Sequence, residues 1–288
     1  MKNLSILIPT YNDECYRLVR NLQQQAAALD ISYEIIVVDD GSTELSVIMD
    51  NCRISNLENC RLIRLRKNCG RSYVRNFLAS NARYEWLLFI DSDMAICRDD
   101  FVKCYAEADG DVVMGGVVIG EVIEGNLRSL YEKTNEEAHT AEKRQQAPYQ
   151  DFHTANFMVR RDIILAHPFD QRFRYYGYED VFLGKTFQEN GIQIHHIDNP
   201  LSFEIFESNE GFIKKTEEGL RTLYEFREEL SGYSRLLDFV KAHPILCIFI
   251  GWWHPLAKRW ERRHLMGNTP NLHIFSLYRL GYYLSFAH

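Results

Sequence analysis

Short apolar runs alternate with longer amphipathic segments through the first hundred residues of the chain. The apolar runs cover residues 4–8, 34–38, 61–65 and 86–90. Helical patterns follow the first and the third run, over residues 14–28 and 70–82. Right-handed βαβ crossovers place helices on both faces of a parallel sheet. The alternation therefore predicts an α/β fold with three α/β/α layers and a mostly parallel central sheet.

The pattern changes after residue 97. Strands are predicted over 111–119, where the run contains a glycine pair, over 152–159 and, as the last strand, over 192–197. Helices are predicted over 123–146, over 180–190 with Gly191 ending it, and over 210–230. The remaining residues, 233–288, form a C-terminal tail that we expect to be helical.

The charge of the chain limits the classes of partner. The net charge of the 288 residues is -7, which argues against a general nucleic-acid binder because such a protein needs a basic face. The segment from 235 to 288 differs, since it holds seven Lys and Arg residues against two acids, a net charge of +5.

Cysteine usage and hydropathy bear on the compartment. The seven cysteines include no Cys-x-x-Cys pair, so the sequence predicts neither a disulfide framework nor a zinc site, and a reducing cytoplasm is expected. The first apolar run is too short for a signal peptide. The longest apolar stretch, residues 244–257, is shorter than the roughly 20 residues that a spanning helix needs, and no transmembrane helix is predicted.

Acidic and aromatic side chains come directly after three of the predicted strands. The segments are Pro9-Thr10-Tyr11-Asn12-Asp13, Asp39-Asp40-Gly41-Ser42 and Asp91-Ser92-Asp93. Ligands of such sheets bind beyond the carboxyl ends of the strands, so the three segments should converge. Two aspartates in Asp-x-Asp spacing, together with diphosphate oxygens, make an all-oxygen site suited to Mg²⁺ or Mn²⁺.

Each of these segments has a purely structural alternative. Asp-x-Asp pairs are common in turns, and residues 39–42 suit a turn with a helix cap. The ring of Tyr11 could pack at a strand end. The hypothesis of a site depends on the conjunction, because all three segments follow an apolar strand, in order, within a hundred residues.

Four motifs together resemble those of family 2 glycosyltransferases of bacterial type. They are Pro9-Thr10-Tyr11-Asn12, Val38-Asp39-Asp40-Gly41-Ser42, Asn68-x-Gly70 with Arg75-Asn76, and Ile90-Asp91-Ser92-Asp93. The resemblance covers roughly residues 1–230 and implies a GT-A-type sandwich. It further implies a nucleotide-sugar-binding half over 1–97 and an acceptor-binding half over 98–232, followed by the tail over 233–288.

The resemblance implies roles for the residues of the first half. The donor would be bound by Pro9, Tyr11, Asp40, Arg75, Asp91 and Ser92. Tyr11 and Asp40 would contact the nucleobase, which is uracil in most of the family, and Asp91 would lie by the ribose and the sugar. Asp93 would ligate Mn²⁺ or Mg²⁺. For Arg75 a helix-face salt bridge is the alternative.

In the second half, Tyr176-Gly177-Tyr178-Glu179-Asp180 resembles the family's Glu-Asp motif. An inverting transferase must remove a proton from the acceptor hydroxyl as that oxygen attacks, and Asp180 would be this base. Glu179 would bind the acceptor or orient the loop. The alternative is that both acids simply favour the first turn of a helix. Asn156, in Thr154-Ala155-Asn156-Phe157, is a further candidate contact to the acceptor or the donor.

One position departs from the family pattern. The resemblance leads us to expect a third metal ligand, a histidine, where this chain has Phe203, and phenylalanine cannot coordinate a metal. Either His195 or His196 takes over, or water fills the position, or metal binding is weakened. Lone histidines in an apolar strand are often structural.

The tail combines tryptophans with basic residues, which leaves two alternatives. An interfacial helix on an anionic membrane surface shows this composition, but the apolar residues could equally pack on the catalytic domain or form a dimer contact. A membrane contact would suit a lipid-linked acceptor and a location at the inner face of the membrane.

The sequence as a whole thus predicts an inverting, divalent-metal-dependent glycosyltransferase. It would move a hexosyl or N-acetylhexosaminyl group from a nucleotide sugar, expected to be UDP-linked, to a saccharide or a lipid-linked acceptor, as in polysaccharide biosynthesis. The alternative is a non-catalytic, glycosyltransferase-like scaffold that has lost part of the metal site. A nucleotidyltransferase would need a glycine-rich basic loop after the first strand, and residues 9–12 offer none.

Overall fold

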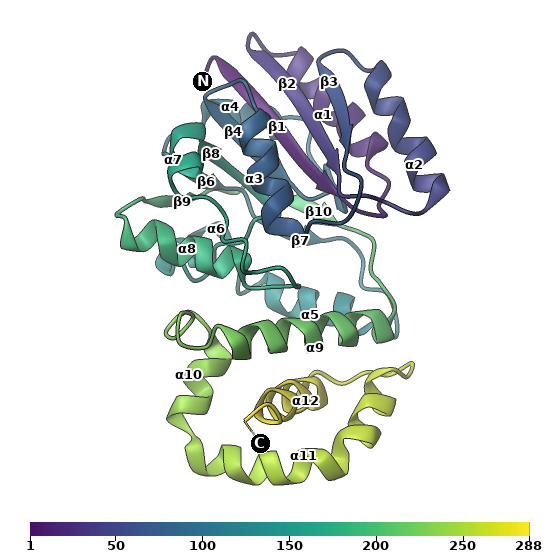
Figure 1. Cartoon of the computed structure of the whole chain (residues 1–288), viewed down its shortest axis with the longest axis vertical. Coiled ribbons are helices and arrows are strands. Elements are labelled where there is room, and N and C mark those ends of the chain that lie inside the picture. Colours follow the sequence, from purple (N-terminus) through teal and green to yellow (C-terminus); the bar gives the residue numbers. More distant parts are fainter. Residues whose placement is uncertain (288) are drawn as a thin grey trace.

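A computed structural model describes residues 1–287, in which a seven-stranded sheet is the centre of the first two thirds of the chain (Figure 1). The strand order is β3-β2-β1-β4-β8-β6-β9. The bounds are β1 Asn3–Thr10, β2 Ser32–Asp39, β3 Cys60–Arg64, β4 Trp86–Ile90, β6 Val112–Met114, β8 Asn156–Arg160 and β9 Ile194–His196. Only β8 runs against its neighbours, which confirms the mostly parallel sheet.

Helices cover both faces of this sheet because alternate residues of its strands point to opposite sides. Ile6 and Ile8 of β1 belong to one apolar cluster, whereas Leu7 belongs to a second cluster on the other face. The first face is covered by α1 (Tyr16–Ala27), α4 (Phe101–Glu107) and a 3-10 turn, η1 (Arg53–Asn56), that follows α2 (Leu45–Cys52). The second face is covered by α3 (Arg71–Asn81), α7 (Arg161–Ala166) and α8 (Glu179–Glu189). The predicted three-layer sandwich is confirmed.

A second, small sheet corrects two of the predicted strands. Its order is β5 (Met94–Ala95), β10 (Leu201–Phe203) and β7 (Val117–Ile119). The run over 111–119 is therefore two strands in two sheets, split at Gly115 and Gly116, where φ is +89° at Gly116. The run over 192–197 is not the last strand, since β10 follows it. The strand β10 has three residues and pairs only with distant strands, so it is too short to show the alternation of apolar and polar residues that predicts a strand.

The predicted helix over 123–146 is also wrong as a single helix. It consists of α5 (Leu127–Glu136) and α6 (Ala141–Gln146). Each has its own N-cap, because the side chains of Asn126 and Thr140 accept hydrogen bonds from backbone N–H groups of their first turns. The predicted strand over 152–159 begins only at Asn156. The helix predicted over 210–230 is α9 (Asn209–Glu225).

The tail is helical, as predicted, and consists of α10 (Arg235–Ala242), α11 (Pro244–Leu265) and α12 (Leu272–Leu284). In Figure 1, α12 lies between α9 and α11, and α11 forms the end of the molecule farthest from the sheet. No single helix of residues 1–287 is long and apolar enough to cross a bilayer. Taken together, α10 and α11 do pass this test of length and composition, although they meet at an angle of 106°.

Close contact between α11 and α12 depends on the missing side chain of Gly281. A Cβ atom at this position would lie 2.7 Å from the Cβ atom of His254 on α11. We therefore expect Gly281→Ala to lower the free energy of unfolding by about 1–3 kcal/mol through overpacking. Urea denaturation measures the change.

Gly219 of α9 is the matched control, because an added Cβ would meet only ordinary contacts, at 3.6 Å from Tyr176. Gly219→Ala should be neutral or raise stability by up to about 1 kcal/mol through helix propensity. Equal stability of the two variants would contradict tight packing at Gly281.

Candidate active site

The carboxyl ends of β1, β2 and β4 bring the three polar segments to one edge of the sheet, as predicted. The first two segments are joined directly, since the backbone N–H of Asn12 donates to the hydroxyl of Ser42 at 2.8 Å and the Asn12 side chain accepts from Thr43 N–H at 2.8 Å. Asn12 adopts a left-handed φ of 50°, which turns the chain after β1. Tyr11, the residue before it, is 46% exposed, so its ring is free to meet a ligand.

Asp40 connects β2 to the loop that precedes α3. One of its carboxylate oxygens accepts from Cys69 N–H at 2.7 Å and the other from Gly70 N–H at 2.9 Å. Burial raises the pKa of Asp40. Its neighbour Asp39 accepts from Ser42 N–H at 2.7 Å, so the structural alternative, a turn closed by this residue, is correct for Asp39. The role of Asp40 toward a base stays a prediction.

Three carboxylates, those of Asp13, Asp91 and Asp93, converge beyond the ends of β1 and β4 and form an acidic group. Burial, together with the negative charges of Asp91 and Asp13, raises the pKa of Asp93 to about 6, and Arg128 and Arg71 act in the opposite direction. Burial also raises the pKa of Asp13, against a hydrogen bond from Ser92. The sequence assigned no role to Asp13, although its position directly after residues 9–12 was a signal.

Arg75 joins this acidic group to the second half of the chain. Its side chain is buried, with the residue 1% exposed. One terminal nitrogen donates to Asp91 at 2.6 Å and the other to Glu179 at 3.3 Å. Arg75 thus forms a salt bridge, as the structural alternative held, but the bridge is buried and both partners lie outside α3. Its contact with a donor stays a prediction. Arg71, one turn earlier on α3, lies 3.9 Å from the same carboxylate of Glu179.

The two acids of the Glu-Asp motif point in different directions. Gly177 and Tyr178 have left-handed φ values of 90° and 69°, and this turn leads into the first residues of α8. Both acids line one cavity, but Glu179 is 4% exposed and paired with Arg75, whereas Asp180 forms no ion pair among the described residues. Burial and the charge of Glu179 raise the pKa of Asp180 to about 7. The Asp180 carboxyl accepts the Val181 N–H at 2.8 Å.

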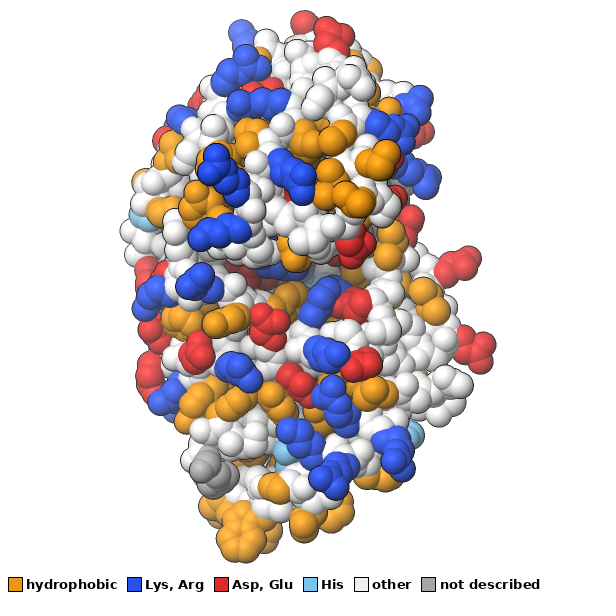
Figure 2. Space-filling view, turned by 45° about the vertical axis from the view of Figure 1, so that its right-hand side comes forward, with side chains coloured by type: hydrophobic (Ala, Val, Ile, Leu, Met, Phe, Trp, Pro, Cys, Tyr) orange, Lys and Arg blue, Asp and Glu red, His pale blue; other side chains and the backbone are white. Residues whose placement is uncertain are grey.

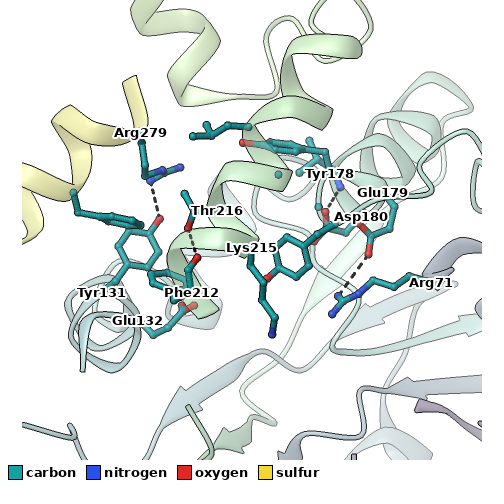
Figure 3. Close-up of a pocket in the computed structure, with 16 residues that line it drawn as sticks. Arg71, Tyr131, Glu132, Tyr178, Glu179, Asp180, Phe212, Lys215, Thr216 and Arg279 are labelled. Atoms are coloured by element: carbon teal, nitrogen blue, oxygen red, sulfur yellow. Dashed lines mark hydrogen bonds and ion pairs between the residues drawn. The ribbon is translucent and has the colours of Figure 1, made fainter. Parts of the chain in front are cut away.

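The cavity beside Asp180 has a volume of about 370 Å³ and is shown in Figure 3. Its lining comes from α3, α5, the turn before α8, α9 and α12. Cationic groups from three of these helices, Arg71, Lys215 and Arg279, face it together with aromatic rings such as Tyr131. Sequence motifs did not reveal Lys215, Arg279 or Tyr131, because these residues are far from the motifs along the chain.

Asn156 does not contact the acceptor, and this expectation was wrong. The residue is fully buried. Its amide nitrogen donates to the carbonyl oxygens of Gly116 at 2.7 Å and Asn199 at 2.9 Å, and its amide oxygen accepts from the Tyr105 hydroxyl at 2.7 Å. These bonds hold the split between β6 and β7 in place, and they leave no free donor for a sugar.

Phe203 lies beside the acidic group, where the resemblance placed a histidine. It pairs with Met94, the residue after Asp93, in the small sheet. It is 3% exposed, and the guanidinium of Arg128 stacks over its ring at 4.3 Å from the ring centre. A cation thus lies next to Asp93, but its source is Arg128.

Neither His195 nor His196 replaces the missing ligand. Both ring nitrogens of His196 are occupied, since Nδ1 accepts from Arg144 at 3.1 Å and Nε2 lies 3.0 Å from the Pro148 carbonyl. Burial lowers its pKa to about 4. His195 is exposed on β9, the edge strand of the large sheet. Within residues 1–287, no three His, Cys, Asp or Glu side chains are grouped as a complete metal site.

The acidic group nevertheless suits a hard divalent cation that a ligand helps to bind. Asp13, Asp91 and Asp93 offer only oxygen atoms, and their mutual repulsion adds to the effect of burial in raising the pKa of Asp93. A second carboxylate oxygen of Asp13 is buried without a hydrogen-bond partner. Protein ligands alone are too few, so the remaining oxygens would come from a bound diphosphate.

Comparison with known proteins places these motifs in a family. A family model described as "Glycosyl transferase family 2" matches residues 5–166. An uncharacterized glycosyltransferase of Haemophilus influenzae is 34% identical over 106 residues, which are 36% of this chain and 41% of the relative. A poly(ribitol-phosphate) beta-glucosyltransferase of Bacillus spizizenii is 32% identical over 138 residues, 46% of this chain and 22% of the relative. The matches thus span less than half of these curated relatives.

Solved structures share the fold over almost the whole chain. A mannosyltransferase from Pyrobaculum calidifontis, in complex with GDP-Man and Mn²⁺, superposes with a TM-score of 0.57 at 14% identity, covering 98% of this chain and 84% of its own. S. aureus TarS 1-349 in complex with UDP-GlcNAc gives 0.51 at 18% identity, with 98% and 90% covered. Both likenesses show the fold, which is that of GT-A glycosyltransferases.

Removal of the Arg75 guanidinium should destabilise the protein strongly. Arg75→Met leaves Asp91 and Glu179 without their cation, and we expect the free energy of unfolding to fall by about 3–5 kcal/mol. Arg53→Met is the control, because Arg53 forms an exposed salt bridge with Asp50 at 2.6 Å. That variant should unfold as the parent does in urea. Equal losses of unfolding free energy in the two variants would show that the buried Arg75 ion pairs contribute no more to stability than an exposed salt bridge does.

Proposed function

This chain belongs to glycosyl transferase family 2, and from that premise we propose that it is an enzyme that transfers a sugar from a nucleoside diphosphate sugar to an acceptor hydroxyl, with inversion at the anomeric carbon. The observation that carries the proposal is that a candidate cation and diphosphate site and a candidate base lie next to each other. The acidic group at the strand ends and the Asp180 cavity are joined by Arg75, which contacts Asp91 on one side and Glu179 on the other.

We assign the nucleotide to the edge of the sheet formed by the first two segments. The exposed ring of Tyr11 would stack on the base, and Pro9, at the end of β1, would border it. Each carboxylate oxygen of Asp40 already accepts one backbone N–H but has a second lone pair for a base N–H. We expect uracil, in keeping with the UDP-GlcNAc bound by TarS, although the Pyrobaculum enzyme binds GDP-Man.

The diphosphate would lie against Asp91, Ser92 and Asp93. A Mn²⁺ or Mg²⁺ ion held by Asp93 would neutralise the charge that develops on the leaving diphosphate. Arg71 and Arg128 add positive charge on the same side, since both lower the pKa of Asp93. Because Phe203 supplies no ligand, we propose that the cation binds well only together with the donor.

Asp180 is the proposed base. In its carboxylate form it takes the proton of the acceptor hydroxyl as that oxygen attacks the anomeric carbon and the bond to the diphosphate breaks. A pKa of about 7 makes the group a stronger base than an ordinary aspartate while leaving much of it ionised at neutral pH. Glu179, buried against Arg75, is a positioning residue that holds the turn before α8.

The acceptor is the part of the proposal that rests on the lining of the cavity. Rings such as Tyr131 and Phe212 offer flat apolar faces, and Lys215 and Arg279 offer donors. This combination suits a saccharide that carries negative charge, free or lipid-linked. We place the enzyme in the cytoplasm, where the seven cysteines, none of them in a disulfide in this structure, would stay reduced.

The pH dependence of transfer tests the role of Asp180. We expect sugar transfer from UDP-sugars to rise with pH, by about tenfold per unit below pH 6, and to level off above pH 7, because only the carboxylate accepts the proton. Asp180→Asn should lower kcat by about a hundredfold or more. Release of UDP, with and without Mn²⁺, measures both effects across a set of nucleotide sugars.

Asp162→Asn is the control for this experiment. Asp162 pairs with Arg160, at the end of β8 opposite to the candidate site, and its side chain is 63% exposed. Its substitution should leave the rate and the pH profile unchanged. A full rate in Asp180→Asn would remove Asp180 from the mechanism. Binding of UDP without turnover of any donor would favour the scaffold alternative.

Introducing the missing histidine tests the place of the cation. In Phe203→His, an imidazole would lie beside Asp93, and we expect Mn²⁺ to bind about tenfold more tightly in the absence of nucleotide. Electron paramagnetic resonance of free Mn²⁺ measures this affinity. Phe206→His, at the ring that packs edge-on against Phe203, is the matched control and should bind Mn²⁺ as the parent does. No gain in Phe203→His would place the cation elsewhere.

A further inference from the structure

The outer face of α11 exposes a row of large apolar side chains to solvent. Eight of them lie on this helix: Ile245, Leu246, Ile248, Phe249, Trp252, Trp253, Leu256 and Trp260. Trp252 is 78% exposed and Leu256 82%. Figure 2 shows hydrophobic side chains gathered at the lower end of the molecule, the end that α11 forms in Figure 1. Monomeric proteins rarely expose a contiguous surface of this kind without a partner for it.

The orientation of α11 is fixed by its inner face. Cys247, His254, Ala257, Glu261 and Leu265 are buried there. His254 Nδ1 lies 2.9 Å from Glu261 Oε2. Because these side chains are packed toward α12 and the core of the tail, turning the tryptophans inward would expose the apolar side chains of Cys247, Ala257 and Leu265 and would break the close packing of His254 on Gly281.

The charges beside the apolar row are all of one sign. Lys258, Arg259 and Arg263 lie at the C-terminal half of α11, and none forms an ion pair among residues 1–287. Figure 2 shows Lys and Arg side chains directly above the apolar end. The segment from 235 to 288 contains two acids, Asp238 and Glu261, and Glu261 is buried.

We propose that the outer face of α11 docks on an anionic lipid surface. Helices that lie in a membrane interface combine exposed Trp, Phe and Leu with Lys and Arg, and anionic headgroups supply the counter-charge. A second copy of this chain fits less well, because its own α11 would bring the same unpaired cations, and Asp238 of α10 is the one exposed acid among residues 235–287. The fixed inner face makes α11 a helix that lies on a membrane and does not cross it.

This docking places the cavity near the membrane surface. The helix α12, which packs against α11, also supplies Arg279 and Phe275 to the cavity beside Asp180. An acceptor carried by a lipid could therefore reach the cavity from the docked side. This last step rests on the proposed function, whereas the docking itself does not.

Vesicle flotation tests the docking. The full chain should float with vesicles containing about 30 mol% phosphatidylglycerol and stay behind with pure phosphatidylcholine. Three of the four tryptophans lie in the exposed row, so their fluorescence should shift to shorter wavelength with the anionic vesicles. The double substitution Trp252→Ser with Leu256→Ser should weaken binding by about tenfold or more. Arg259→Gln with Arg263→Gln should weaken it severalfold and reduce its dependence on salt.

The matched control lies on α2, where Leu45 and Met49 have the same spacing and are 76% and 73% exposed. Leu45→Ser with Met49→Ser should float as the parent does. The proposal is overturned if the parent does not float, if the α11 double variant floats equally well, or if sedimentation shows a dimer that this variant abolishes. None of these readouts uses sugar transfer, so an inactive protein that floats would leave the docking intact and refute only the proposed function.

Discussion

One buried guanidinium holds the candidate site together. Arg75 extends from α3 to the carboxylate that follows β4 and to the carboxylate that begins α8. A cation buried to this degree is stable only when it is paired, so the end of the sheet and the turn before α8 are fixed relative to each other. That relation sets the separation between the acidic group at the strand ends and Asp180, which any transfer between a bound donor and an acceptor needs.

Each side of this bridge holds one acid that is paired with Arg75 and one acid that is not. Asp91 and Glu179 share Arg75 as an ion-pair partner, whereas Asp93 and Asp180 form no ion pair within residues 1–287 and have raised pKa values, about 6 and about 7. The first of these groups lies where a cation and a diphosphate would relieve the repulsion, and the second lies in a cavity where it can accept a proton. Stable pairs thus form the frame, and the unpaired acids are left for chemistry.

The tail is part of the site and not an appendage. The family match ends at residue 166, yet the cavity draws on α9 and α12, which come later in the chain. The family model thus covers the strand-end segments, whereas the cavity proposed for the acceptor depends on helices beyond the matched residues. The same tail presents the apolar row of α11 to the outside, so one set of helices faces the cavity with one side and solvent with the other.

The sequence by itself determined the early strands of the sheet and the polar residues that follow each of them. Strong apolar runs followed by Tyr11, Asp40 and Asp91 are local signals, and a parallel sheet must bring such strand ends together. Tertiary structure decided what is made by contacts between distant segments. It split the run over 111–119 at its glycine pair, buried Asn156 among backbone carbonyls, and put Arg128 on the ring of Phe203. It also brought Lys215 and Arg279 to Asp180. Periodicity reports only neighbours along the chain, so pairings across a hundred residues leave no trace in it.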